Sequence, residues 1–93
     1  MTGGPFVRTV EICNERGLHA RASAKFVKMA SLFDAEVEVS RDGQTVDARS
    51  IMGLMMLAAG IGSEIEISAT GPQAEEAVEA LSRLVCERFE EER

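Results

Sequence analysis

The sequence predicts a two-layer open-faced α/β sandwich with the element order β-α-β-β-α-β-α. Several segments alternate apolar and polar residues, which is typical of strands with one buried face and one wet face. The segments between them repeat apolar residues at helical spacing, so they can cover the buried face. A chain of 93 residues can form one modest core, and we expect a single domain over residues 1–93 with flexible tails at 1–5 and 90–93.

The first predicted strand and helix occupy the N-terminal third of the chain. Apolar and polar residues alternate from Phe6 to Cys13, with Val10 and Ile12 on the inner side. A helix is predicted from about Ala20 to Leu32, with Asp34 after it. Its apolar stripe consists of Phe26, Val27, Ala30 and Phe33.

A hairpin and a short helix are predicted next. Residues 35–39 alternate without exception and are followed by Asp42-Gly43, which favours a type I′ turn. The partner strand is residues 44–48, with Val46 and Ala48 inward. Ser50 is the predicted N-cap of a helix over the Met-rich segment 51–57.

The last two elements are a strand and a long helix. Residues 64–69 alternate, and we expect Ile65, Ile67 and Ala69 to point inward, with this strand beside the first one. The helix begins after Pro72, because proline and acidic residues are favoured in a first turn. Its predicted buried stripe is Ala74, Ala77, Val78, Leu81, Leu84, Val85 and Phe89.

Composition excludes several classes of function. The formal net charge is −6 and no run of Lys or Arg occurs, so we expect no binding to nucleic acid. No segment is a leader peptide or has transmembrane length, which predicts a cytoplasmic protein without membrane insertion. Cys13 and Cys86 fit no zinc spacing, so we expect no metal site; we interpret both as reduced buried thiols, with a disulfide as the alternative.

The chemistry of the chain is expected at His19, the only histidine. It precedes a predicted helix, whose free N–H groups and positive dipole end favour a phosphate. A neutral imidazole is a nucleophile near neutral pH, so His19 is a candidate carrier of a phosphoryl group. The backbone N–H groups of Ala20, Arg21 and Ala22 and the Arg21 guanidinium would then hold the phosphate.

This hypothesis competes with a simpler one, in which His19 is a capping or surface residue. No carboxylate pair, Gly-rich phosphate loop or metal cluster accompanies it in the sequence. The chain therefore lacks the groups that activate a nucleotide, and we expect a phosphoryl carrier without cofactors rather than an enzyme. Its donor would be another phosphoprotein.

Two motifs give the chain a family resemblance. Gly17-Leu18-His19-Ala20-Arg21 resembles the active-site signature of HPr, the histidine-containing phosphocarrier of the phosphoenolpyruvate-dependent phosphotransferase system, and residues 49–57 resemble the second signature of that family. The resemblance implies a four-stranded antiparallel sheet with three helices on one face. It also implies that His19 accepts phosphate from phospho-enzyme I through the ring nitrogen nearer the backbone and passes it to enzyme IIA proteins, with Arg21 as the phosphate partner.

The sequence departs from this family beside the histidine. The family usually has Pro and then Ala after the arginine, whereas this chain has Ala22 and Ser23. Ala22 lacks the φ restraint of proline and keeps an additional N–H donor, so the rate of phosphate transfer is the property it would change. Ser23 adds a hydroxyl that could cap the helix or contact the phosphate, but we expect it to face solvent.

The second signature predicts a docking surface and a regulatory site. The family implies an exposed patch of Leu18, Ile51, Met52 and Met55, with Leu54 and Leu57 in the core; methionine suits a surface that accepts several partners. Ser50 matches the serine that HPr kinase/phosphorylase phosphorylates in some lineages. A phosphate there would place charge on the patch and weaken docking to enzyme I.

The branch of the family stays open. Ser50–Gly53 is similar to the sugar-transport branch, whereas residues 70–77 and the acidic C-terminal end are similar to the nitrogen-related branch. Other hypotheses are a regulatory module that docks without transferring phosphate and a small ligand-binding sandwich. We expect a monomer in each case.

Overall fold

The computed structural model describes residues 5–93, so the predicted N-terminal tail, apart from Pro5, lies outside the described residues. The order β-α-β-β-α-β-α is confirmed. The elements are β1 (Phe6–Glu11), α1 (Ala20–Ala30), β2 (Glu36–Arg41), β3 (Gln44–Asp47), α2 (Ile51–Met56), β4 (Glu64–Thr70) and α3 (Ala74–Cys86), followed by a short 3₁₀ turn at Arg88–Glu90.

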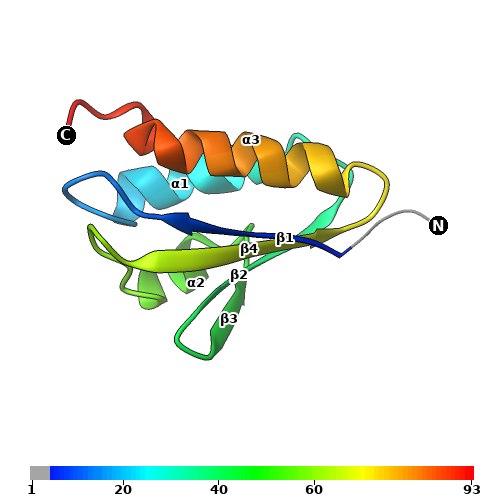
Figure 1. The fold of residues 1–93 in the computed structure, drawn as a ribbon, viewed down its shortest axis with the longest axis horizontal. Coiled ribbons are helices and arrows are strands. Elements are labelled where there is room, and N and C mark those ends of the chain that lie inside the picture. The colour runs from blue at the N-terminus through cyan, green and yellow to red at the C-terminus, as the bar shows by residue number, and fades with distance from the viewer. Residues whose placement is uncertain (1–4) are drawn as a thin grey trace.

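The four strands form one antiparallel sheet in the order β1-β4-β2-β3. The predicted pairing of the first strand with the fourth is therefore confirmed. Helices α1 and α3 lie side by side over one face of the sheet (Figure 1), and α2 packs against α1 and β3. The fold is the predicted open-faced sandwich.

Burial follows the alternation of the strands. The predicted inner residues of β4, Ile65, Ile67 and Ala69, are buried, whereas Glu64 and Glu66 on the same strand are exposed. Strand β2 continues the pattern with two exposed glutamates. The face of the sheet away from the helices is consequently acidic.

The hairpin turn has the predicted geometry. Asp42 and Gly43 both have positive φ, at +50° and +81°, as a type I′ turn requires. The flanking residues Arg41 and Gln44 are paired across β2 and β3. The predicted inward Ala48 is buried just beyond β3, where its N–H donates to the Val37 carbonyl oxygen.

The C-terminal end differs from the prediction. The whole apolar stripe of α3 is buried, Phe89 included, but the helix ends at Cys86. Arg88, Phe89 and Glu90 have φ values of +58°, +54° and +65°, so Phe89 reaches the core from a left-handed turn rather than from a helix. This turn folds the last residues back over α1, and the expected solvated tail at 90–93 is wrong for Glu91.

The prediction of buried thiols is also wrong. Cys13 and Cys86 are free and both are exposed. Cys13 lies two residues beyond the end of β1, and Cys86 is the last residue of α3. Each follows a fully buried residue, Ile12 or Val85. None of the helices in residues 5–93 is long and apolar enough to cross a membrane.

Candidate functional site

The loop that carries His19 is fixed by close contacts of its backbone. Asn14 is fully buried and donates through Nδ2 to the Gly17 carbonyl oxygen at 2.9 Å. Gly17 has a φ of +65°, and a Cβ there would lie 2.3 Å from the Ala59 carbonyl oxygen. That oxygen accepts the Leu18 N–H at 3.0 Å. The loop is therefore held against the segment that follows α2, and only glycine fits at position 17.

His19 is the N-cap of α1. Its Nδ1 accepts a hydrogen bond from the backbone N–H of Arg21 at 3.2 Å, and its own ψ of 179° is extended. The first intrahelical bond runs from the Ser23 N–H to the His19 carbonyl oxygen at 2.9 Å. The N–H groups of Ala20, Arg21 and Ala22 thus belong to the first turn, where helical partners are absent and an anion is stabilised.

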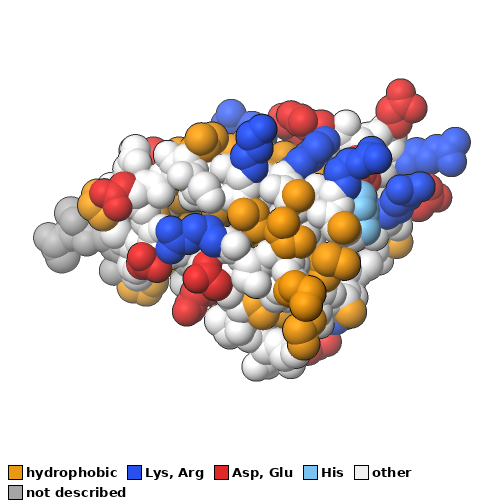
Figure 2. All heavy atoms as spheres, turned by 180° about the vertical axis from the view of Figure 1, so that it is seen from behind, with side chains coloured by type: hydrophobic (Ala, Val, Ile, Leu, Met, Phe, Trp, Pro, Cys, Tyr) orange, Lys and Arg blue, Asp and Glu red, His pale blue; other side chains and the backbone are white. Residues whose placement is uncertain are grey.

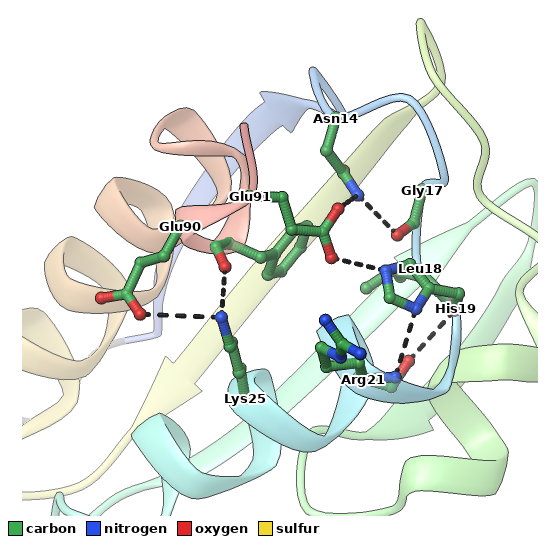
Figure 3. A network of polar contacts seen from close by, with 10 residues as sticks. Asn14, Gly17, Leu18, His19, Arg21, Lys25, Glu90 and Glu91 are labelled. Carbon is green, nitrogen blue, oxygen red and sulfur yellow. Dashed lines mark hydrogen bonds and ion pairs between the residues drawn. The ribbon is translucent and has the colours of Figure 1, made fainter. Parts of the chain in front are cut away.

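The opposite ring nitrogen of His19 contacts the C-terminal segment. Nε2 lies 2.5 Å from Oε2 of Glu91, and Oε1 of the same carboxylate accepts from Asn14 Nδ2 at 3.0 Å (Figure 3). The side chains of His19 and Glu91 are only 23% and 15% exposed. Burial alone would raise the pKa of the Glu91 carboxyl, but hydrogen bonds from Asn14 and His19, the charge of Lys25 and, when the ring is protonated, the charge of His19 lower it below its ordinary value.

Lys25 ties the same segment to α1. Its ammonium donates to the Phe89 carbonyl oxygen at 2.8 Å and lies 3.7 Å from Oε1 of Glu90. The Glu15 N–H also donates to the Arg93 carbonyl oxygen at 3.1 Å. Sequence reasoning missed Glu91, Asn14 and Lys25 as site residues, because no local pattern connects positions this far apart. The buried Phe89 was the one signal that the chain end is anchored.

Arg21 has the freedom that a phosphate partner needs. It is exposed, and among residues 5–93 its guanidinium has no hydrogen bond or ion pair. Figure 3 places it next to the His19 ring, and it lines an open polar groove with Arg16, Lys25 and the C-terminal residues. Figure 2 shows Lys and Arg side chains gathered around the histidine. The net charge of −6 gave no sign of these cations, which share the groove with Glu15, Glu90, Glu91 and Glu92.

Three expectations beside His19 need correction or refinement. Ser23 does not face solvent: it is fully buried, and its Oγ donates to the Leu18 carbonyl oxygen at 3.1 Å. Leu18 is only 5% exposed and packs in the core, so it is not available to a partner. Ala22 is also fully buried, so a side chain at this position meets the core as well as the first turn of α1.

The residues of the second signature lie where the sequence placed them. Ser50 caps α2 by accepting the Gly53 N–H on Oγ at 2.9 Å. Leu54 and Leu57 are in the core. The exposed apolar residues of α2 form one set, which we call the α2 patch: Ile51, Met52, Met55 and also Met56, which sequence reasoning left out. Figure 2 shows exposed hydrophobic side chains on the face of the molecule that presents the histidine.

No candidate metal centre accompanies these features. Within the part of the chain that the structure describes, no three His, Cys, Asp or Glu side chains are grouped as metal ligands. The groups present at the site are the His19 imidazole, the Glu91 carboxylate and cationic side chains at the N-terminus of α1.

Comparison with known proteins places this geometry in a family. A model described as the PTS HPr component phosphorylation site matches residues 6–87. The chain belongs to the HPr family of phosphocarrier proteins. It is 52% identical over 84 residues to phosphocarrier protein HPr of Cupriavidus necator, covering 90% of this chain and 94% of that protein. HPr-family membership confirms the resemblance seen in the two motifs and makes this chain a phosphocarrier of the phosphotransferase system.

A second relative and a solved structure are also similar to this chain. Phosphocarrier protein NPr of Shewanella violacea is 42% identical over 84 residues, covering 90% of this chain and 92% of that protein. The crystal structure of HPr-C-His from Thermoanaerobacter tengcongensis is 43% identical, with a TM-score of 0.90, and covers 95% of this chain and 99% of that one. Relatives named HPr and NPr both resemble this chain, and the HPr fold extends over nearly all of it.

Proposed function

We propose that the chain carries a phosphoryl group on Nδ1 of His19, accepting it from phospho-enzyme I and passing it to enzyme IIA proteins. The observation that carries this proposal is the position of Nδ1 against the first turn of α1, 3.2 Å from the Arg21 N–H. Phosphate oxygens in that position would accept the backbone N–H groups of Ala20, Arg21 and Ala22. The Arg21 guanidinium, which has no polar partner among residues 5–93, would neutralise the phosphate charge.

The α2 patch is the proposed docking surface for these partners. On the six-residue helix α2, Ile51 is 41% exposed, Met55 is 42% exposed and Met52 is 73% exposed. Flexible methionines can adapt to a donor and to several acceptors. A small apolar patch beside a cationic surface is suited to transient complexes, because a carrier must both associate with and dissociate from its partners rapidly.

Ser50 is the proposed regulatory site, with HPr kinase/phosphorylase as the enzyme that would modify it. Its Oγ is the N-cap acceptor of α2, so a phosphate there would keep a favourable place at the helix start. The added charge would lie at the beginning of the α2 patch and weaken docking to enzyme I. We propose that the protein works as a single-domain monomer in the cytoplasm.

Phosphohistidine formation is tested by incubating the protein with enzyme I and phosphoenolpyruvate. We expect phosphate that is stable in base, labile in acid and absent from His19→Ala. Ser50→Ala is the matched control and should be labelled like the parent. If the parent chain takes up no label, the carrier hypothesis is excluded. The hypothesis of a regulatory module that docks without transferring phosphate then takes its place.

The match to an NPr supports the nitrogen-related branch as the second candidate. The two branches differ in the acceptor, so labelled protein should be offered to purified IIA proteins of the sugar and nitrogen-related branches of the same host. Faster transfer to one of the two assigns the branch.

A further inference from the structure

We propose that Glu91 is a positioning residue for His19, whose carboxylate keeps the ring proton on Nε2 and so leaves the lone pair of Nδ1 free for the phosphoryl donor. This inference rests on the proposed function, since it concerns the same ring nitrogen. It adds a residue from the C-terminal segment, 72 positions along the chain, to a site otherwise built at the start of α1.

Two hydrogen bonds require the same tautomer of the ring. The Arg21 N–H is a donor, so Nδ1 at 3.2 Å must accept and cannot carry a proton. An ionised carboxylate only accepts, so Nε2 at 2.5 Å from Glu91 must carry the proton. A neutral imidazole satisfies both contacts only as the Nε2–H form. A carboxylate orients the histidine of Ser-His-Asp enzymes in the same manner.

The carboxylate is held in place before any donor arrives. Asn14, itself fully buried, donates to Glu91 Oε1 while Nε2 of His19 contacts Oε2, so each oxygen has its own partner. Phe89 is fully buried two residues earlier, and Lys25 holds its carbonyl oxygen. The lowered pKa of Glu91 agrees with an ionised carboxylate at neutral pH. Such preorganisation costs no rearrangement during transfer.

The transfer step is balanced without proton release. The Nδ1 lone pair forms the N–P bond, the bond from phosphorus to the donor breaks, and its electron pair leaves with the donor. The ring keeps its Nε2 proton and becomes a phosphoimidazolium, whose positive charge faces the Glu91 carboxylate. The Arg21 N–H, released by Nδ1, can then donate to a phosphoryl oxygen. Glu91 therefore stabilises the charge that develops on the ring.

The test compares Glu91→Gln and Glu91→Ala with Glu92→Gln. Glu92 is a suitable control because it is exposed and its carboxylate has no hydrogen bond or ion pair within residues 5–93. The first readout is the ¹⁵N spectrum of the His19 imidazole, which separates the two neutral tautomers. The second is the rate of phosphorylation by phospho-enzyme I.

We expect the parent and Glu92→Gln to be in the Nε2–H form and to react at equal rates. Glu91→Ala should show a mixture of tautomers, and both Glu91 variants should react roughly tenfold more slowly. Unchanged rates in both variants would overturn the proposal, and so would faster rates, which would mean that the carboxylate competes with the phosphoryl group. If the parent takes up no phosphate, the proposed function fails, while the imidazole spectra still decide whether Glu91 sets the tautomer.

Discussion

The carbonyl oxygen of Ala59 lies 2.3 Å from the point where residue 17 would place a Cβ. We therefore expect Gly17→Ala to destabilise the fold through both its left-handed φ and this collision. The φ alone costs about 1–2 kcal/mol for an L-residue. Gly43→Ala separates the two effects, because Gly43 has a φ of +81° and no atom within 4 Å of its Cβ position. Urea unfolding should show a larger loss for Gly17→Ala, and equal losses would remove the role assigned to the collision.

The burial of Phe89 predicts that the chain end contributes to stability. Phe89→Ala should lower the free energy of unfolding by about 3–5 kcal/mol, as for other fully buried phenylalanines. Phe6, which is 37% exposed at the start of β1, provides the control, and Phe6→Ala should cost much less. A small effect of Phe89→Ala in chemical denaturation would show that the left-handed turn does not anchor the C-terminal segment.

The lowered pKa of Glu91 predicts a pH dependence of stability. A group whose folded-state pKa lies below its unfolded value of 4.5 stabilises the fold above that value and loses this effect as the pH falls through the folded-state pKa. The stability difference between the parent and Glu91→Gln should thus be constant near neutrality and shrink in acid below about pH 4.5. Unfolding curves of both proteins at several pH values measure it, and a difference that grows in acid would contradict the assignment.

The N-cap of α2 predicts different effects for two changes at Ser50. Ser50→Ala removes the acceptor of the Gly53 N–H and should cost about 1 kcal/mol. Ser50→Asp keeps an acceptor and should leave stability near that of the parent, but it adds charge beside the α2 patch. It should therefore accept phosphate from phospho-enzyme I more slowly. Equal phosphorylation rates for Ser50→Asp and the parent would exclude the regulatory proposal.

Exposure of the α2 patch predicts a variant that affects docking alone. Met52→Ala should change stability by less than about 0.5 kcal/mol, because the side chain is 73% exposed. It should nevertheless raise the KM for phosphorylation by enzyme I. Leu32→Ala removes a side chain of similar exposure, 70%, that lies outside α2. If both variants have the KM of the parent, Met52 lies outside the docking surface.

Local patterns predicted most of the fold because each strand has one buried face. The alternation at Ile65, Ile67 and Ala69 and the Asp42-Gly43 turn describe contacts between near neighbours or along one element. The position of His19 before α1 was predicted for the same reason. Glu91 belongs to a run of charged residues that predicts a solvated tail. No pattern among neighbouring residues indicates the left-handed turn at residues 88–90.

Burial at single positions was predicted less well than the elements themselves. Ser23 and Leu18 lie beside the histidine in a motif, and their polarity or their place in that motif suggested exposure. The structure buries both because the first turn of α1 packs on the core, where the Ser23 hydroxyl finds a backbone acceptor. The burial of Ser23 and Leu18 depends on packing between segments that are distant in the sequence.

Charged side chains are distributed unevenly over the surface of the molecule. Glutamates of β2 and β4 lie on the open face of the sheet. Lys and Arg side chains gather around the histidine (Figure 2). The field of an acidic surface on a partner would orient the molecule so that the side with His19 faces that partner. A larger fraction of diffusional collisions would then be productive. Added salt screens this electrostatic attraction. It should therefore change the rate of association with an acidic donor more than the rate of dissociation.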